Sequence, residues 1–509
     1  MKNMYSKIIQ NVYWIQLFLI SLIGILIIFV STKNFGVNVS TDSTTYFQAA
    51  TQIINQQPVD MVLWPPLYPA ILALFSSLFT VKILEAARIV NAIFFGITIF
   101  ASGILFRRHL QKYQITLLLG ICTVLLSDTL IQMYLGADSE SPFILFSTLF
   151  LLSLDNYWEN KRRRDLLLSG FWVALCCLTR YAGVAFIFAG VLCIVWLNKT
   201  IIKKMVYDLS CYITVSSLPI LAWLIRNKVI SGTFTGVRTP SGYSYYDNII
   251  KMGKDVSGWY VPEKIVPNGY LIAGTLLVIA FIVGIYFIRV WKNDKPAFSW
   301  QYPLIIYITI YIIFLIASAP FRSMMSVRFL SPIYIPLNLL LLSSLFEISK
   351  IWGRKIASWK QEIPLILFLL MFVALLTYRT KLAMTEQMVQ GSGYTSKAWR
   401  DSQTIRFLEN DLPKCTVYTN GADVIGFLTG KDVNRLPRKL NMSGSLELTT
   451  LESLWGLWPM EENVCIVWFT NITWRDYYFT PEELLQITHL QQEIRLEDGI
   501  IYVVTKIHP

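Results

Sequence analysis

Short polar links divide most of the chain into long runs of apolar residues. The runs lie near residues 14–31, 66–81, 86–106, 114–134, 141–157, 166–180, 182–197, 208–226, 268–289, 302–319, 329–346 and 363–379. Apolar runs of about 18 residues predict helices that cross a bilayer. The run at 66–81 follows Trp64-Pro65-Pro66 directly, and paired prolines do not fit a helix interior. We therefore expect an all-α polytopic protein with about eleven spans, and a juxtamembrane helix at 66–81.

Lysine and arginine residues gather in five of the short links. These links are residues 107–112, 161–164, 199–204, 289–295 and 350–360. If 66–81 lies along the interface, all five links face the cytoplasm together with the lysines of the N-terminus, as the positive-inside rule favours. This arrangement leaves on the outer side residues 32–85, 135–140, 227–267, 320–328 and everything after 380.

The composition agrees with a multi-pass protein of the plasma (inner) membrane. Of its residues 54% are hydrophobic and 15% are charged, against about 25% charged in soluble proteins. The formal net charge of +12 would suit a nucleic-acid partner. The cations lie in links between apolar runs, however, so they serve topology and no nucleic-acid binding is expected.

The last 130 or so residues change character. After the membrane module at 1–379, whose outer loop 32–85 carries juxtamembrane helices, residues 380–509 contain an amphipathic helical pattern at 396–412 and strand-like segments near 415–419, 463–470 and 499–506. They predict a small extracytoplasmic α/β domain. Cys415 and Cys465 each open a strand-like segment, and either a disulfide or two inert thiols fits this pattern.

Asp42 lies about ten residues past the first span, on the predicted outer side. One interpretation is an N-cap for a helix at 44–54, with Ser40 and Thr41 as competing caps. Its neighbours favour a functional role, because Tyr46 lies one turn further on and the segment containing Trp64 and Tyr68 then returns to the interface.

A second polar group occupies the predicted turn at 136–142, GADSESP. Asp138 and Glu140 are two carboxylates at the membrane edge, where charge is costly and often marks a site or a metal. The alternative is a solvated turn that caps the next helix.

Three arginines lie at the outer ends of predicted spans, against the positive-inside bias. They are Arg180, Arg322 and Arg328. A phosphate group is a natural partner, because guanidinium offers several aligned donors. Snorkelling to lipid head groups is the alternative.

Together these motifs resemble the GT-C glycosyltransferases, in particular the bacterial branch related to protein O-mannosyltransferases and the lipid A aminoarabinose transferase. The shared features are an outer acid after the first span, PPLYP at 65–69, the second acidic motif, LTRY at 178–181 and RFLSP at 328–332. The likeness covers roughly residues 10–350 and depends on the order and spacing of short motifs.

The resemblance implies an inverting hexosyl- or pentosyltransferase of the bacterial cell envelope. Such an enzyme moves a sugar from a polyprenyl-phosphate donor to a lipid, glycan or protein acceptor on the outer face. Asp42 matches the family's catalytic acid, as the base that takes the acceptor's proton. The residues expected to bind substrate are Tyr46, Trp64, Tyr68, Asp138, Glu140, Arg180, Arg322 and Arg328.

The chain departs from this pattern in ways that bear on cofactors. Relatives often place His or Lys before the paired prolines, where this chain has Leu63 and Trp64. It has only three histidines, so a histidine-rich metal site is not expected. A divalent cation, if used, would be held by Asp138 and Glu140.

Two other function classes fit a polytopic protein of this kind. A transporter or flippase for a lipid-linked glycan would show repeats or broken helices with midplane charges, which the sequence does not show clearly. An O-antigen ligase or polymerase usually relies on a large late outer loop, whereas the acids here lie in the first two outer loops.

The basic links give a prediction about topology. A reporter that is active only in the cytoplasm should be silent when fused after residue 509, because the domain at 380–509 is expected on the outer side. The same reporter fused within 161–164 should be active. Activity of the fusion after residue 509 would show that the topology is wrong.

Overall fold

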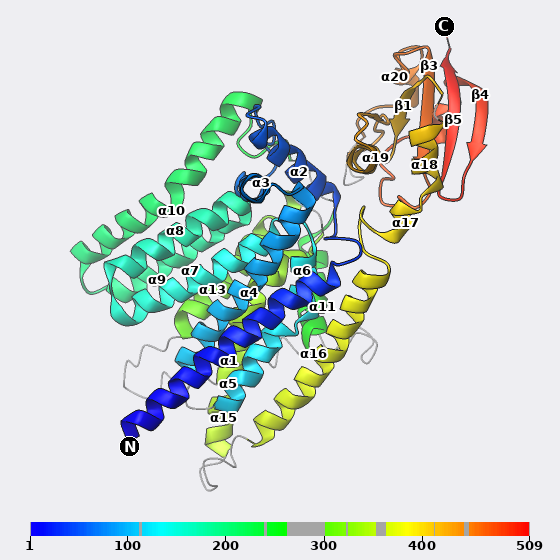
Figure 1. Cartoon of the computed structure of the whole chain (residues 1–509). Coiled ribbons are helices and arrows are strands. Elements are labelled where there is room, and N and C mark those ends of the chain that lie inside the picture. The colour runs from blue at the N-terminus through cyan, green and yellow to red at the C-terminus, as the bar shows by residue number, and fades with distance from the viewer. Residues whose placement is uncertain are drawn as a thin grey trace.

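The computed structural model describes residues 2–110, 114–238, 242–261, 301–321, 324–352, 363–411, 413–441 and 447–507. Figure 1 shows a bundle of long helices and, next to one end of it, a small domain that contains the sheet. The expected span at 268–289 and Arg322 lie outside the described residues.

The helices of the bundle, in chain order, are α1 (Lys2–Ser31), α2 (Thr41–Ile54), α3 (Leu67–Phe79), α4 (Ile83–Leu110), α5 (Gln114–Leu125), α6 (Asp128–Leu135), α7 (Glu140–Asn160), α8 (Arg163–Thr179), η1 (Tyr181–Gly183), α9 (Val184–Asn198), α10 (Ile202–Ser231), α11 (Tyr245–Tyr260), α13 (Gln301–Ala317), η2 (Ala319–Phe321), α14 (Val327–Leu330), η3 (Ser331–Ile333), α15 (Tyr334–Trp352) and α16 (Ile363–Val389). Among the described residues, five helices are long and apolar enough to cross a membrane, or six if the bent pair α5–α6 is one span. The chain is thus a multi-pass membrane protein, but the expected eleven spans are not confirmed.

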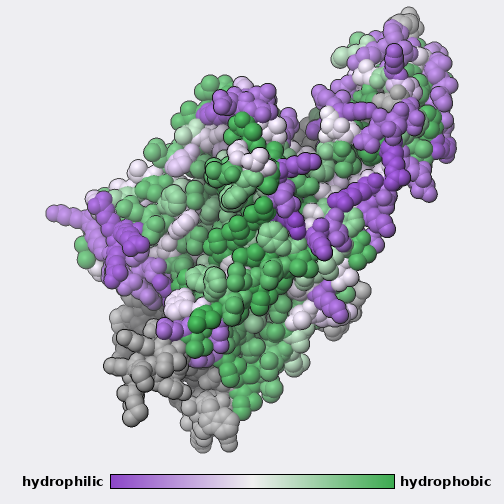
Figure 2. All heavy atoms as spheres, in the orientation of Figure 1, coloured by the Kyte–Doolittle hydropathy of each residue, from purple (hydrophilic) through white to green (hydrophobic). Residues whose placement is uncertain are grey.

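The bundle exposes apolar side chains, as a helix facing lipid does. Leu26 is 58% exposed and Met371 is 74% exposed. Figure 2 shows hydrophobic residues across the visible face of the bundle, whereas the surface of the small domain is mostly hydrophilic. Helix α3 has 13 residues and extends about 20 Å, which is less than the roughly 30 Å of a hydrocarbon core.

The apolar run at 114–134 is broken, which the sequence pattern did not predict. Helices α5 and α6 meet at an angle of 41°. The Ser127 hydroxyl accepts a hydrogen bond from the Leu130 amide and starts α6 as a new helix. Asp128 Oδ2 then lies 2.7 Å from Arg379 Nη2 of α16, so the charge at this break is paired within the protein.

The C-terminal domain is a mixed α/β unit. Its elements are α17 (Lys397–Arg400), α18 (Gln403–Asn410), β1 (Thr416–Thr419), α19 (Ala422–Thr429), β2 (Asn434–Arg435), α20 (Leu451–Leu454), β3 (Asn463–Phe469), α21 (Pro481–Leu484), β4 (Thr488–Arg495) and β5 (Gly499–Lys506). The sheet order is β2-β1-β3-β5-β4. Strands β2, β1 and β3 are parallel, and β5 pairs antiparallel with both β3 and β4. The three predicted strand segments are therefore confirmed.

Two details of this domain bear on predictions made from the sequence. Cys415 and Cys465 form a disulfide between the start of β1 and β3, which decides between the two alternatives. The single amphipathic helix expected at 396–412 is instead two short helices. Ser402 caps α18 by accepting a hydrogen bond from the Ile405 amide, so the chain turns between α17 and α18.

Short backbone bridges connect the domain to the segment before α2. Asn38 pairs with Gly136, and Val39 pairs with Gly393. The Tyr394 amide donates to the Val39 carbonyl at 2.9 Å. Three distant parts of the chain thus meet beside residue 39.

Gly393 gives a prediction about this junction. Its φ is +59°, and an added Cβ would collide with Asn38 Oδ1 and the Val39 carbonyl. Gly393→Ala should therefore cost at least about 3 kcal/mol of stability. Gly430→Ala is the matched control, because Gly430 also has positive φ (+70°) but nothing lies within 4 Å of its Cβ position. Thermal unfolding and protease cleavage near residue 393 would be compared in the two variants. Equal stability of both variants would show that a Cβ at residue 393 does not collide with Asn38 and Val39.

Candidate active site

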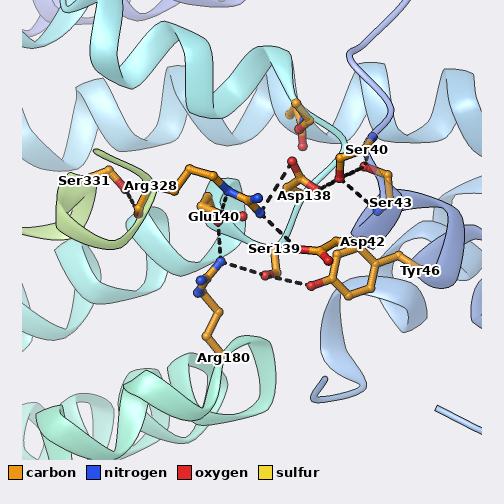
Figure 3. A network of polar contacts seen from close by, with 12 residues as sticks. Ser40, Asp42, Ser43, Tyr46, Asp138, Ser139, Glu140, Arg180, Arg328 and Ser331 are labelled. Carbon is orange, nitrogen blue, oxygen red and sulfur yellow. Dashed lines mark hydrogen bonds and ion pairs between the residues drawn. The ribbon is translucent and has the colours of Figure 1, made fainter. Parts of the chain in front are cut away.

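The polar groups singled out in the sequence meet at one end of the bundle. They come from the first turn of α2, from the turn between α6 and α7, from the end of α8 and from α14. Figure 3 shows their side chains pointing toward one another. The residues joined by hydrogen bonds or ion pairs are Ser40, Asp42, Ser43, Tyr46, Asp138, Ser139, Glu140, Arg180 and Arg328.

Local sequence explains why α2 begins where it does. Ser40 is its N-cap and forms a capping box with Ser43. The helix therefore starts at Thr41 rather than at residue 44, and Asp42 lies in the first turn. The interpretation of Asp42 as the cap is wrong, and its carboxylate is left for other partners.

The acidic turn is held by an asparagine in the middle of α4. Asn91 donates to the Tyr134 carbonyl (3.1 Å) and the Gly136 carbonyl (2.6 Å), and it accepts from the Ser141 hydroxyl (2.7 Å). Asn91 was not expected in the site. Its signal in the sequence was an amide inside an apolar run, because such a group needs partners of its own once it is buried.

Arg328 contacts all three carboxylates of the site. Its Nε donates to Glu140 Oε1 at 2.7 Å, and its Nη2 lies 3.3 Å from Asp42 Oδ2 and 3.7 Å from Asp138 Oδ2. The Ser331 hydroxyl donates to the Arg328 carbonyl (2.9 Å) and so fixes the start of η3. One guanidinium thus sets the spacing of three acids from two parts of the chain, the first turn of α2 and the turn that begins α7.

Glu140 is the most deeply buried of these acids, with 2% of its side chain exposed. Its Oε1 lies 2.5 Å from Arg180 Nη1 in addition to the Arg328 contact. Arg180 also donates to the Ser139 hydroxyl at 3.3 Å. A buried carboxylate needs such compensation, since an unpaired charge would be very costly there.

Asp138 has a different environment from Glu140. Its Oδ1 accepts hydrogen bonds from the Ser40 and Ser43 hydroxyls at 2.8 and 3.0 Å. Burial, and then the nearby charge of Glu140, raise the pKa of Asp138 to about 6, although Arg328 opposes this shift. Asp138 therefore changes its charge near neutral pH.

Asp42 is the most accessible acid, with 32% of its side chain exposed. Burial of the rest raises the pKa of its carboxyl above the usual value, and the charge of Arg328 opposes that shift. A partly exposed carboxylate with a raised pKa can both meet a ligand and accept its proton.

An aromatic wall stands next to Asp42. Tyr46 packs edge to face on Tyr68 and on Trp64, with ring centroids 5.4 and 6.1 Å apart. The Tyr46 hydroxyl donates to the Ser139 hydroxyl at 3.2 Å. The structure thus brings together eight of the nine residues expected to form the site, since Arg322 is not described.

Two further arginines hold the loop that carries Trp64. Arg226 donates to the carbonyls of Val59 and Met61, and Arg238 donates to the Leu63 carbonyl at 3.0 Å. Neither arginine was expected in the site, although Arg226 ends a predicted span on its outer side and Arg238 lies in the predicted outer loop, both against the positive-inside bias. Arginines from other parts of the chain thus bind this loop, in which the chain lacks the His or Lys that the related proteins often place before the paired prolines.

A cavity of about 360 Å³ opens beside the acidic turn. It shares Asp138, Glu140 and Arg328 with the site and extends to α6, α16 and the loop after α16. Its other lining residues are Asn38, Gln132, Met133, Leu135, Gly136, Ala383, Glu386, Gln387, Gly391 and Ser392. Half of these residues carry an amide, hydroxyl or carboxylate group, and the other half are apolar or glycine, so the cavity suits a ligand with both hydroxyl groups and apolar faces, as a sugar ring has.

A divalent cation at Asp138 and Glu140 would have to share these acids with two guanidinium groups. Glu140 Oε1 bonds Arg180 and Arg328, whose positive charge disfavours a metal ion there, whereas Glu140 Oε2 is buried and has no hydrogen-bond partner among the described residues. Within the described ranges, the group of three potential ligands that lies closest together is His109, Asp155 and Glu159. It lies about 22 Å from Glu140 along α7, and Asp155 is paired there with Arg108.

Comparisons with known proteins agree with this architecture. A sequence profile described as dolichyl-phosphate-mannose-protein mannosyltransferase matches residues 64–223, which include Trp64, Asp138 and Arg180. Among curated proteins, no sequence matches the chain.

Solved structures match over almost the whole chain. ArnT from Cupriavidus metallidurans in the apo state matches with a TM-score of 0.61 and 12% identity, over 97% of this chain and 98% of ArnT. The same protein bound to undecaprenyl phosphate matches with a TM-score of 0.58 and 12% identity, over 95% and 97%. The arabinofuranosyltransferase AftD from Mycobacteria matches with a TM-score of 0.53 and 15% identity, over 96% of this chain and 40% of AftD. The resemblance to GT-C glycosyltransferases is confirmed at the level of the fold.

The raised pKa of Asp138 gives a prediction about stability and pH. Its folded pKa, about 6, lies above the unfolded value, so the ionised form opposes folding. The cost is absent below about pH 4, grows between about pH 4 and 6 and reaches about 3 kcal/mol at most. The thermal stability of the Asp138→Asn variant should therefore fall less than that of the wild type as the pH rises over this range.

The control for this measurement is Asp411→Asn, which removes an exposed aspartate of the C-terminal domain. Wild type and both variants would be unfolded in detergent at pH 4, 5, 6 and 7. A stability profile of Asp138→Asn with the same slope as the wild type would show that the environment of Asp138 is described wrongly.

Proposed function

We propose that this protein is an inverting glycosyltransferase that moves a sugar from a polyprenyl phosphate to an acceptor hydroxyl on the outer face of the membrane. The observation that carries the proposal is the partly exposed Asp42, fixed by Arg328 beside an aromatic wall and a cavity that Asp138, Glu140 and Arg328 also line. Support comes from a fold shared with ArnT, which has been solved with undecaprenyl phosphate bound.

In the proposed reaction Asp42 acts as general base. Its carboxylate takes the proton of the acceptor hydroxyl while the acceptor oxygen bonds to the anomeric carbon from the side opposite the phosphate. The bond between that carbon and the phosphate oxygen breaks, and its electron pair leaves with the polyprenyl phosphate. Arg328 Nη2, 3.3 Å from Asp42 Oδ2, orients the carboxylate so that the other oxygen faces the acceptor.

The donor phosphate is assigned to the guanidinium groups of the site. The side chain of Arg328 is 38% exposed, and among the described residues its hydrogen bonds and ion pairs are made by Nε and Nη2 rather than Nη1. That nitrogen can donate to a phosphate oxygen while Nε and Nη2 keep the acids in place. Arg322 is proposed as a second arginine that donates hydrogen bonds to the phosphate, as the resemblance to the glycosyltransferases implies.

The acceptor is assigned to the cavity beside the acidic turn. Its volume of about 360 Å³ suits one or two sugar rings or a hydroxylated head group, and its amides and carboxylates can pair with hydroxyls. The sugar that is transferred, a hexose or a pentose, is the one that the polyprenyl-phosphate donor carries. Both classes enter the test, since the similar proteins include a mannosyltransferase family and an arabinofuranosyltransferase.

The disulfide between Cys415 and Cys465 supports an outer location of the C-terminal domain, because disulfides persist in oxidising compartments. One observation favours the rival transporter function, namely the broken pair α5–α6. The Asp128 charge at that break, however, is paired with Arg379. We therefore assign the break to shaping the cavity, which Gln132 and Met133 of α6 line.

The test is the replacement of Asp42 by asparagine. Asp42→Asn should lower turnover about 100-fold or more, on the scale of losing a general base. Membrane levels should not change, because Ser40 and not Asp42 caps the helix. The matched control is Asp60→Asn, which makes the same change at an exposed acid of the same loop.

Turnover would be measured in membranes supplied with labelled undecaprenyl-phosphate mannose or undecaprenyl-phosphate arabinose, as release of undecaprenyl phosphate. A wild-type protein that consumes neither donor, or an Asp42→Asn variant as active as wild type, would contradict the proposal. Movement of the intact labelled lipid across the bilayer, without release of sugar, would favour the transporter.

A further inference from the structure

The C-terminal domain touches α2 one residue away from Asp42. Arg475 Nη2 donates to Thr41 Oγ1 at 3.2 Å, and the Tyr394 hydroxyl lies 3.0 Å from the same oxygen. Thr41 is the first residue of α2. The first turn of α2 is therefore held from two sides, by Asp138 through Ser40 and Ser43 and by the C-terminal domain through Thr41.

The group behind this contact is buried and held by several hydrogen bonds. Arg475 and Asp423 form a two-pronged ion pair, with both oxygen–nitrogen distances 2.7 Å and each side chain 6% exposed. The Tyr394 hydroxyl donates to Asp423 Oδ2 at 2.5 Å. Arg475 also donates to the Asn420 carbonyl. Such a pair has one geometry, because guanidinium and carboxylate are both planar.

The hydrogen-bond directions make Thr41 part of this group. Since the Tyr394 proton points to Asp423, the Tyr394 oxygen accepts from the Thr41 hydroxyl. The Thr41 oxygen in turn accepts from Arg475 Nη2. Threonine thus donates once and accepts once, and valine of the same shape can do neither.

Apolar packing joins the same two parts of the chain. Tyr46 and Phe47 of α2 share one buried cluster with Val424 and Ile425 of α19. The rings of Phe47 and Phe427 lie 6.2 Å apart. The contact is therefore part of a core, and α19 is the element of the domain that lies closest to α2 in Figure 1.

We propose that Arg475, Asp423 and Tyr394 are positioning residues, by which the C-terminal domain sets the place of Asp42 through the hydroxyl of Thr41. The proposal rests on the proposed function of Asp42. The domain then contributes to the reaction without touching the substrate, because a general base works only within hydrogen-bond distance of the acceptor proton.

The experiment compares Thr41→Val with Thr41→Ser in the full-length protein in membranes. The donor is whichever of undecaprenyl-phosphate mannose and undecaprenyl-phosphate arabinose the wild type consumes. Thr41→Val should lower kcat about tenfold, as expected for a small displacement of a reacting group, and leave the donor KM within about twofold. Thr41→Ser keeps the hydroxyl and should retain the wild-type kcat.

The control for the domain is Glu483→Gln. Glu483 pairs with Lys439 inside the C-terminal domain, with distances of 2.9 Å, and caps α21 rather than contacting α2. Its loss reports the effect of weakening the domain alone. A kcat for Glu483→Gln as low as that for Thr41→Val would show a general structural effect and overturn the proposal.

A double-mutant cycle with Asp42→Asn separates the two proposals. If Thr41 acts through Asp42, adding Thr41→Val to Asp42→Asn should change the residual rate less than twofold. An additional tenfold loss would overturn the positioning role and leave the general base intact. Asp42→Asn alone at the wild-type rate would overturn the base, and with it the role of Thr41. Thr41→Val at the wild-type kcat would overturn the positioning role alone.

Discussion

A buried carboxylate at the start of α7 governs the arrangement of this protein. Glu140 is almost fully enclosed, and among the described residues the guanidinium groups of Arg180 and Arg328 compensate its charge. Because such a charge without partners would be prohibitively costly at the edge of a bilayer, α7, the end of α8 and α14 must approach one another. The remaining contacts of Arg328 then bring in Asp42 and Asp138.

The three acids of the site differ because their surroundings differ. Glu140 stays charged between two cations, Asp138 is hydrogen-bonded by two serines with its pKa near 6, and Asp42 is partly open to ligand. One arginine connects all of them. This division lets one carboxylate hold the structure while another is free to accept a proton, as the proposed transfer reaction requires.

The C-terminal domain is part of this arrangement rather than an appendage. The backbone bridge between Val39 and Gly393, the contact between Arg475 and Thr41 and a shared apolar cluster attach it to the segment that carries Asp42. This segment around residue 40 is short. Contacts with the C-terminal domain and with the acidic turn hold it in place, and they therefore fix the direction of its side chains.

The sequence by itself determined the membrane character, the helical bundle, the mixed C-terminal domain and most residues of the site. These features follow from local signals, which do not depend on contacts between distant residues. The signals are the length of the apolar runs, the strand-like segments and the charges placed against the positive-inside bias. It could not decide the cap of α2 between Asp42 and its neighbours, nor the pairing of Cys415 with Cys465. The tertiary structure decided these, together with the break between α5 and α6, the role of Asn91 and the contact of Arg475 with Thr41. Each of these depends on partners that are distant in sequence, and no local pattern specifies which buried polar group will meet which.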